Sequence, residues 1–554
     1  MAKFFDYIIV GGGSAGCTLA ARLSENNNLS VCLIEAGGGG KNLFIKMPAG
    51  NGFVFGNPDL DWGFQSTPQK NLNGRSIYLP RGKGLGGSSN MNGMIYMRGV
   101  SADYDKWQKM GLKGWSYSDM LPYFIKSESS KHRNDQWHGN FGPIATEPSV
   151  NFGVLEKAFI DAAMKAGHNF LEDFNGPSRT GVGRTESMIR NGIRQSSNIA
   201  YLKRKPKNLT IMKKCHIARI LLNKNRASGV ETINGKKILC HKEIILCQGA
   251  FGTPQTLLLS GIGPEDHLKK LNIPIHMKLP GVGENLADHV DVSMQYSSNR
   301  MDLSLARFQR LDRALQLMIR WLLFKSGPGS GAFFSAVLFH AFKDLTLPEL
   351  QVYMTPMIID ENLTNEKEDS TPLFERLGRK FLARGRKVAR PGIQIDINQM
   401  RPKSLGTVRL KSNNPLDCPL INPNYYEVRS DLEEMIEGVK VMREVMSKEE
   451  ISRHHSGELS PFRDAKTNKE IEEAIYKSTY SGHHPCSTAR MGPENDSSAV
   501  LDSDLKVRGF DNLRVCDASA FPTQITGNLN ATVIAMAEKA ADEILTDSEL
   551  YSKH

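Results

Sequence analysis

The chain has 554 residues, which is enough for two or more structural units with sizeable cores. Its 70 basic and 59 acidic residues give a net charge of +11, but no basic module with interleaved aromatic residues stands out, so we predict that the protein does not bind nucleic acid. The eight cysteines show no CxxC pair and no metal-ligand spacing, so we expect no metal site.

The cellular location is predicted from the start of the chain and from its cysteines. The first apolar run begins at Phe4, which leaves no room for a signal peptide before it. The scattered cysteines suit a reducing compartment, and no apolar run reaches the roughly 18 residues that a membrane-spanning helix needs. We therefore expect a cytoplasmic protein, with peripheral contact to the cytoplasmic face of a membrane as an open alternative.

The first 35 residues predict a nucleotide-binding unit. An apolar run at residues 4–10 leads into the glycine-rich sequence GGGSAG at residues 11–16, and a helical pattern follows. A second apolar run at residues 31–34 ends in Glu35. A strand, a glycine turn, a helix and a second strand followed by an acid are the parts of a dinucleotide-binding βαβ unit.

Each residue of this unit has a physical role. Gly11 permits the tight turn, Gly13 lets a pyrophosphate approach the backbone, and Gly16 lets the helix pack closely on the strand. The helix N-terminus offers free N–H groups to the phosphates. Glu35 is placed to accept hydrogen bonds from the adenosine ribose. The unit alone does not distinguish FAD from NAD.

A second glycine-rich stretch, GKGLGGSSNMN at residues 82–92, also predicts contact with a ligand. Its glycines and serines let the backbone approach something flat or phosphorylated, and they supply N–H donors. A flexible linker is the alternative. The apolar residues at positions 94–97 directly behind it argue against mobility.

Further strands and helices follow in chain order, as judged from apolar runs and from one-face apolar spacing. The predicted strands are residues 209–212, 217–222, 243–247, 350–359, 393–397, 407–410 and 513–519. The predicted helices are residues 152–167, 249–263 (which includes a glycine turn at each end), 303–325, 431–446, 469–476 and 533–545. Asn528 and Asn530 are plausible caps for the last helix.

Residues 376–390 form a basic run of seven arginine and lysine side chains, with Leu377, Phe381 and Leu382 between them. Such a run predicts either an amphipathic segment that binds a surface or a solvated helix face beside the mouth of the active site. The solvated face is the commoner of the two.

Taken together, these segments resemble the glucose-methanol-choline (GMC) family of FAD-dependent oxidoreductases, nearly from end to end. The bacterial alcohol and choline dehydrogenases are the most similar branch. Thr256 is a small departure, because the family usually has an aliphatic residue there. The motifs that carry the resemblance are GGGSAG with Glu35, the sequence of residues 82–99, GAFGTPQTLLLSGIG at residues 249–263, His484-Pro485 before residues 490–492, and Asp517-Ala518-Ser519 with GNLNAT at residues 527–532.

The resemblance implies an α/β fold with a Rossmann-like FAD-binding domain and an inserted α+β substrate domain, whose antiparallel sheet is covered by helices. We expect the FAD-binding domain to comprise residues 1–153, 195–298 and 482–554. The substrate domain is expected to comprise residues 154–194 and 299–481.

The resemblance also implies an extended FAD. The position that carries a flavin-linking histidine in some members is Met91 here, so we predict noncovalent binding. The residues expected to contact FAD are Gly11, Gly13, Ser14, Ala15, Glu35, Ala36, Arg81, Gly86, Gly87, Ser88, Asn92, Gly93, Met94, Ile217, Gly249, Asp517, Ala518, Asn528 and Thr532.

The pair that faces the flavin in the family corresponds to His484 and Asn528. Oxidising an alcohol requires removal of a hydroxyl proton and of a hydride, which goes to flavin N5. A histidine suits the role of base, so we predict His484 as the catalytic base. Asn528 is predicted to orient the developing alkoxide through its amide. His483 is expected in the wall of the substrate pocket.

We therefore predict an FAD-dependent alcohol dehydrogenase that converts a primary alcohol to an aldehyde and passes electrons to a quinone or another acceptor. An oxidase that is reoxidised by oxygen is the first alternative. A lyase or photodecarboxylase that keeps FAD is the second, although the presence of His484 disfavours it. A flavoprotein without turnover would leave His484 and Asn528 idle.

The substrate is predicted from two features of the same resemblance. In choline-oxidising relatives an aromatic residue often precedes the catalytic histidine, but His483 stands there, and no acid between residues 300 and 400 can be placed in a cation cage. Phe333, Phe334, Leu338 and Phe339 lie where relatives build the roof of the pocket. We therefore expect a hydrophobic aliphatic or aromatic alcohol, with Phe334 in the pocket.

Overall fold

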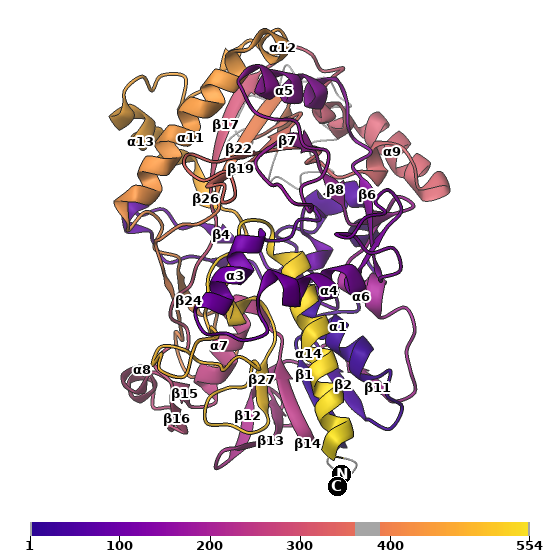
Figure 1. Cartoon of the computed structure of the whole chain (residues 1–554), viewed down its shortest axis with the longest axis vertical. Helices are drawn as coiled ribbons and strands as arrows, with labels where there is room; N and C mark the ends of the chain where they lie inside the picture. Colours follow the sequence, from indigo (N-terminus) through magenta and orange to yellow (C-terminus); the bar gives the residue numbers. More distant parts are fainter. Residues whose placement is uncertain (1–2, 361–387, 552–554) are drawn as a thin grey trace.

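The computed structural model describes residues 3–360 and 388–551, which form two lobes along the long axis of the molecule (Figure 1). One lobe is built on a largely parallel sheet close to both ends of the chain, and the other on an antiparallel sheet at the opposite end. The predicted fold class is confirmed. Most of the basic run, residues 376–387, lies outside the described residues. Within the described ranges, no helix combines the length and the apolar character needed to cross a bilayer.

The first sheet has seven strands in the order β11-β2-β1-β14-β13-β12, and β27 pairs with β14. β11, β2, β1, β14 and β27 run parallel, whereas β12 and β13 extend the sheet with antiparallel pairing. Parallel strands are buried on both faces, which explains the continuous apolar runs of β1 and β2. The strands are β1 (Lys3–Val10), β2 (Val31–Ile34), β11 (Leu209–Met212), β12 (Ile217–Asn223), β13 (Arg226–Thr232), β14 (Lys237–Leu246) and β27 (Leu513–Val515).

Helices α1 (Ser14–Leu23) and α14 (Leu529–Tyr551) pack against each other beside the first sheet. α1 follows β1 directly, so its N-terminus lies at the carboxyl edge of the parallel strands. Open α/β sheets bind their ligands at this edge. α14 starts four residues earlier than predicted, so Asn530 belongs to its first turn and does not precede it.

The second sheet is antiparallel, in the order β25-β17-β22-β19-β18-β7, and β26 pairs with β17. Helices α5 (Val154–Lys165) and α11 (Arg429–Ser447) share one hydrophobic core with its three central strands. The strands are β7 (Gly181–Arg184), β17 (Val290–Ser297), β18 (Ala336–His340), β19 (Leu350–Thr355), β22 (Gly392–Gln399), β25 (Gly457–Glu458) and β26 (Thr479–Ser481).

The central strands of this sheet alternate apolar and polar residues, because successive side chains point to opposite faces. Val290, Val292 and Met294 of β17 belong to the core with α5 and α11, whereas Asp291 and Ser293 line a cavity on the other side. β19 and β22 repeat the pattern. Their cavity-lining residues are Tyr353, Thr355, Gln394, Asp396 and Asn398.

Most predicted elements are present, but several of their boundaries differ. The predicted helix at residues 303–325 is a short 3-10 turn followed by α9 (Leu311–Phe324), because Arg310 between them is extended, with φ −66° and ψ 134°. The predicted strand at residues 350–359 is divided into β19 and β20 (Ile358–Asp360) around Pro356, which has no N–H to donate to a strand ladder. β17 lies before residue 298 but belongs to the second sheet, so the chain changes sheet before the predicted domain boundary.

Candidate active site

A cavity of about 2410 Å³ is lined by the carboxyl edge of the first sheet and by the polar face of the second. Pockets for drug-sized ligands have roughly 300–1,000 Å³, so this cavity has room for a dinucleotide and a small substrate together. The predicted site residues that line it are Gly11, Gly13, Ser14, Ala15, Glu35, Ala36, Arg81, Gly87, Ser88, Asn92, Gly93, Met94, Ile217, Gly249, Phe334, His483, His484, Asp517, Ala518 and Asn528.

Two predicted residues do not line the cavity. The N–H of Gly86 donates to the carbonyl of Gly12 at 2.7 Å, which joins the two glycine-rich segments. The hydroxyl of Thr532 is fully buried and lies 2.7 Å from the hydroxyl of Tyr104. The structure therefore gives both residues a role in holding the walls together.

Open backbone and unpaired acceptors mark the nucleotide half of the cavity. A Cβ added at Gly13 would meet only the carbonyl oxygen of Cys247, at 3.7 Å, and one added at Gly249 would meet nothing within 4 Å. Oδ1 of Asn530 and Oε1 of Gln248 are buried without a hydrogen-bond partner in the described structure, and both residues line the cavity. Accessible backbone and unsatisfied acceptors fit a bound FAD, whose ribityl and ribose hydroxyls are donors.

Glu35 lies at the end of β2 and has its carboxylate in the cavity wall. The carboxylate accepts hydrogen bonds from the N–H groups of Gly12 at 2.8 Å, Gly37 at 2.7 Å and Gly84 at 3.1 Å. Burial raises the pKa of Glu35, and these N–H groups oppose the rise. Glu35 thus connects both glycine-rich segments, and its ribose contact stays a prediction.

Asp517 follows β27 and connects it to helix α7 (Gly249–Leu259). Its carboxylate accepts hydrogen bonds from the N–H of Gly249 at 2.8 Å and from the hydroxyl of Thr253 at 2.6 Å. The other oxygen accepts the N–H of Ser519 at 2.8 Å. These bonds fix the turn that carries Ala518, which also lines the cavity.

His484 and Asn528 come together in the cavity from two separate loops. Nε2 of His484 lies 3.1 Å from Nδ2 of Asn528. Oδ1 of Asn528 accepts hydrogen bonds from the hydroxyl of Tyr353 at 3.0 Å and from the amide of Gln351 at 3.3 Å. Because both donors occupy the amide oxygen, the amide nitrogen is the atom that faces His484.

A second histidine, His289, determines which nitrogen of His484 carries a proton. Nε2 of His289 lies 3.0 Å from the carbonyl oxygen of Ile525, which can only accept, so this nitrogen is protonated. A neutral imidazole has one N–H, so Nδ1 of His289 is an acceptor. It lies 2.9 Å from Nδ1 of His484, which must therefore donate. Nε2 of His484 is left with a lone pair that faces Asn528.

Both imidazoles are neutral at neutral pH. Burial lowers the pKa of His484 well below its ordinary 6.5, and the neighbouring His289, His483 and Arg81 lower it further. Burial also lowers the pKa of His289 to about 4. The lone pair on His484 is thus present at neutral pH.

The backbone around His484 is held from several sides. The carboxylate of Asp288 accepts a hydrogen bond from the backbone N–H of His484 at 2.8 Å. The side-chain amide of Gln524 donates to the backbone carbonyl of His484 at 2.9 Å. Arg81, predicted as a flavin contact, donates to the carbonyl of His483 at 2.9 Å. His483 itself adopts φ +64°, in the left-handed region that is uncommon for residues other than glycine. These contacts fix the direction of the imidazole at position 484.

Comparison with known families agrees with this geometry. The N-terminal model of the GMC oxidoreductase family matches residues 5–291, and its C-terminal model matches residues 402–537. The chain belongs to the GMC oxidoreductase family. The resemblance stated from sequence motifs is thereby confirmed.

Curated and solved relatives of this GMC oxidoreductase cover nearly its whole length. It is 36% identical to the oxygen-dependent choline dehydrogenase of Photobacterium profundum, over 99% of this chain and 94% of the relative. The choline dehydrogenase of Brucella suis is also 36% identical, over 98% and 95% of the two chains. Pyridoxine 4-oxidase from Mesorbium loti superposes with a TM-score of 0.83 at 29% identity, over 97% and 99% of the two chains.

A formate oxidase variant from Aspergillus oryzae has a TM-score of 0.86 at 26% identity and covers 99% of both chains. An FAD-dependent oxidoreductase from Chaetomium thermophilum has a TM-score of 0.84 at 27% identity, over 98% and 100% of the chains. GMC oxidoreductases are FAD-dependent enzymes, so FAD is the cofactor of this one.

The substrate half of this GMC cavity is more polar than the sequence led us to expect. Asp291 of β17 and Asp396 of β22 both line it, and Asp396 belongs to the region between residues 300 and 400 in which the sequence alone placed no acid in a cation cage. Burial raises the pKa of Asp291 well above its ordinary value, and the neighbouring Asp396 carboxylate adds to the rise. The alternation of polar and apolar residues in both strands was the sequence signal for this polar face.

The four apolar residues from the region that forms the roof of the pocket in relatives fall into two groups. Phe333 and Phe334 line the cavity. Leu338 and Phe339 of β18 are fully buried in two separate hydrophobic clusters and do not reach it. Of the four residues, only the two that precede β18 line the cavity.

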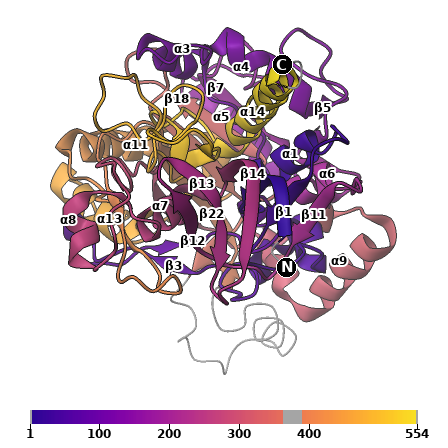
Figure 2. The ribbon, with the colours of Figure 1, turned by 90° about the horizontal axis from the view of Figure 1, so that it is seen from below.

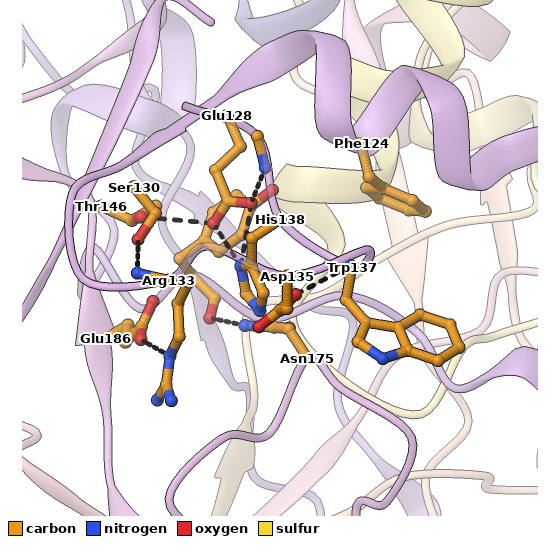
Figure 3. Close-up of polar contacts among 12 residues, drawn as sticks. Phe124, Glu128, Ser130, Arg133, Asp135, Trp137, His138, Thr146, Asn175 and Glu186 are labelled. Atoms are coloured by element: carbon orange, nitrogen blue, oxygen red, sulfur yellow. Dashed lines mark hydrogen bonds and ion pairs between the residues drawn. The ribbon is translucent and has the colours of Figure 1, made fainter. Parts of the chain in front are cut away.

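A further cluster of titratable groups lies outside the cavity. Asp135, His138 and Asp173 bring one potential ligand atom each within 4.8 Å of one another. Figure 3 shows His138 beside Glu128, and the two imidazole nitrogens lie 3.0 Å from Glu128 and 3.1 Å from Asp173. Because carboxylates engage both nitrogens, we interpret the group as a buried ion-pair cluster and not as a metal site.

Proposed function

We propose that this GMC oxidoreductase oxidises a primary alcohol to an aldehyde, with His484 as the base and Asn528 as the group that orients the alkoxide. The observation that carries this proposal is the hydrogen-bond chain from Ile525 through His289 to His484, which leaves a lone pair on Nε2 beside the amide of Asn528. A neutral, fixed imidazole in the cavity is suited to accept the hydroxyl proton.

The protein residues account for the proton and for the developing charge. Nε2 of His484 accepts the hydroxyl proton, which makes the imidazole a cation beside the alkoxide. The N–H of Asn528 donates to the same oxygen and stabilises its negative charge. FAD, which we predict to bind noncovalently, would supply the capacity to take up the hydride of the alcohol carbon. The alcohol would then leave as the aldehyde, with its hydroxyl proton on His484 and its two electrons held by the cofactor.

The polar wall of the cavity points to an alcohol that carries a cationic or hydrogen-bond-donating group. Asp291 and Asp396 lie diagonally across neighbouring strands, because Asp291 pairs with Asn398 and Ser293 pairs with Asp396. An ammonium group between them would stabilise their ionised form. Choline, which the curated relatives are named for, has such a group. It is therefore the first alcohol to test, ahead of the hydrophobic alcohols expected from the sequence.

The identity of the electron acceptor decides between two candidate functions, dehydrogenase and oxidase. A quinone or another organic acceptor would make the protein a dehydrogenase, as predicted from the sequence. Oxygen would make it an oxidase, and the names of the choline dehydrogenase, pyridoxine oxidase and formate oxidase relatives favour testing this alternative directly. Peroxide formed during turnover in air, measured against turnover with a quinone under argon, distinguishes them. A lyase is disfavoured by the histidine and amide pair.

The decisive experiment is an anaerobic panel of alcohols followed at the flavin absorbance band. We expect an amino alcohol to bleach the flavin in the wild-type protein. His484→Ala should keep its FAD but reduce the flavin about 100- to 10,000-fold more slowly, because the proton acceptor is absent.

His483→Asn is the matched control, because asparagine tolerates the left-handed backbone and the adjacent base is kept. This variant should stay within about tenfold of the wild-type rate. Flavin reduction by His484→Ala at the wild-type rate would contradict the assignment of the base. The cytoplasmic location of the protein stays a prediction.

A further inference from the structure

Helix α9 carries an apolar patch on its outer side. Leu315, Ile319, Leu322 and Leu323 repeat at the spacing that places residues on one helix face, and Phe324 is the last residue of the helix. All five are exposed, with Leu323 at 69% and Phe324 at 71%. No other helix or strand in the described part of the chain has more than two exposed large apolar side chains.

The inner side of the same helix is fixed to the protein. Trp321 is buried, and its indole N–H donates to the carbonyl of Gly192 at 2.7 Å. Leu311, Ala314 and Leu317 line the cavity, and Leu315 of the patch lines it as well. The apolar patch is therefore displayed on a firmly packed helix, which lies at the periphery of the molecule in two perpendicular views (Figures 1 and 2).

The chain segment that carries the patch is rich in basic side chains. Residues 300–325 contain six arginines and lysines but only two acids, Asp302 and Asp312. Arg313 and Arg320 lie one above the other on a separate stripe of α9, next to the apolar stripe. Arg320 and Lys325 form no ion pair with any carboxylate among the described residues. An apolar face with basic flanks is the pattern of a helix that lies in the surface of a membrane.

We propose that α9 docks the protein onto an anionic phospholipid bilayer, with Leu322, Leu323 and Phe324 inserted among the acyl chains and the arginines at the headgroups. A second copy of the chain is a poorer occupant, because a two-fold contact would place two basic surfaces against each other. The cavity wall formed by Leu311 and Ala314 would then lie next to the bilayer. The proposal does not depend on which alcohol is oxidised.

The test is flotation of the full-length, FAD-loaded protein with vesicles of phosphatidylglycerol and phosphatidylcholine, and with vesicles of phosphatidylcholine alone. We expect the wild-type protein to float with the anionic vesicles and to bind the neutral ones at least tenfold more weakly. The double variant Leu323→Glu/Phe324→Glu should lose at least tenfold of the binding to anionic vesicles, with unchanged FAD content and unchanged flavin reduction by a water-soluble alcohol.

Phe141→Glu is the matched control, because Phe141 is a fully exposed phenylalanine outside α9. This variant should float like the wild type. Equal flotation of the double variant and the wild type would overturn the proposal, as would a wild-type protein that ignores anionic vesicles. Light scattering on the same samples measures the oligomeric state. If the wild type is a dimer and the double variant a monomer, a second copy covers the patch, and this result would also overturn the proposal.

Discussion

At the scale of single residues, His289 is a positioning residue whose effect on His484 can be measured. It accepts the Nδ1–H of His484 at 2.9 Å because its own Nε2–H is held by Ile525. His289→Leu leaves that N–H buried without an acceptor, so the imidazole can turn or change its tautomer. We expect the rate of anaerobic flavin reduction to fall about tenfold while FAD stays bound.

His289→Asn separates positioning from packing, because its amide oxygen can replace the acceptor nitrogen. Stopped-flow absorbance should show that this variant recovers part of the rate lost in His289→Leu. Identical rates in the two variants would mean that the hydrogen bond has no part in activating His484.

At the scale of elements, the proposed preference for a cationic alcohol depends on the polar face of the second sheet. Asp291→Asn removes one carboxylate from this face and keeps its size and its position on β17. We expect the KM for choline to rise about tenfold, with little change for an uncharged alcohol of similar size. In the wild type, KM for choline should fall as the pH rises, because burial and Asp396 raise the pKa of Asp291 and cation binding needs its ionised form.

Ser293→Ala is the control on the same strand face, since it removes a polar group without removing charge. Steady-state kinetics with both alcohols provide the measurement. An equal change in KM for the charged and the uncharged alcohol would contradict a cation-binding role of the acids.

The same elements define what the sequence could predict. The βαβ unit at residues 3–34 is local, so its spacing alone predicted a nucleotide site, and the family resemblance predicted His484 and Asn528 as the catalytic pair. The alternation of β17 and β22 was visible too, but it does not tell which strands are neighbours. Only the pairing of β17 with β22 places Asp291 close to Asp396. The partner of His484 is 195 positions away along the chain, beyond the reach of any spacing rule.

At the scale of the whole molecule, the ion-pair cluster around His138 links stability to pH. Glu128 lies between the guanidinium of Arg98, at 2.8 Å, and the imidazole of His138. Burial by itself lowers the pKa of His138, but hydrogen bonds to Asp173 and Glu128 outweigh it and raise the pKa from 6.5 to about 9. A pKa raised on folding stabilises the protein below the unfolded value, and this stabilisation is lost as the pH rises towards 9.

His138→Gln removes the titrating group and keeps a hydrogen-bonding side chain. We expect the thermal midpoint of the wild type to exceed that of the variant by several degrees at about pH 6, and the difference to shrink by about pH 9. Calorimetry of both proteins across this range provides the measurement. A difference that stays constant, or that grows with pH, would show that His138 is neutral in the folded protein.

The order in which the first sheet is assembled has a consequence for synthesis. β1 leaves the ribosome first, but its neighbour β14 follows only after residue 237, and β27 and α14 come last. One edge of the apolar strand β1 therefore stays unpaired until nearly half of the chain has been synthesised, which favours capture by chaperones. Translation that stops before Asn528 would yield a chain with both glycine-rich segments but without α14 and without the amide beside His484, so by the proposed mechanism a prematurely terminated product would not turn over.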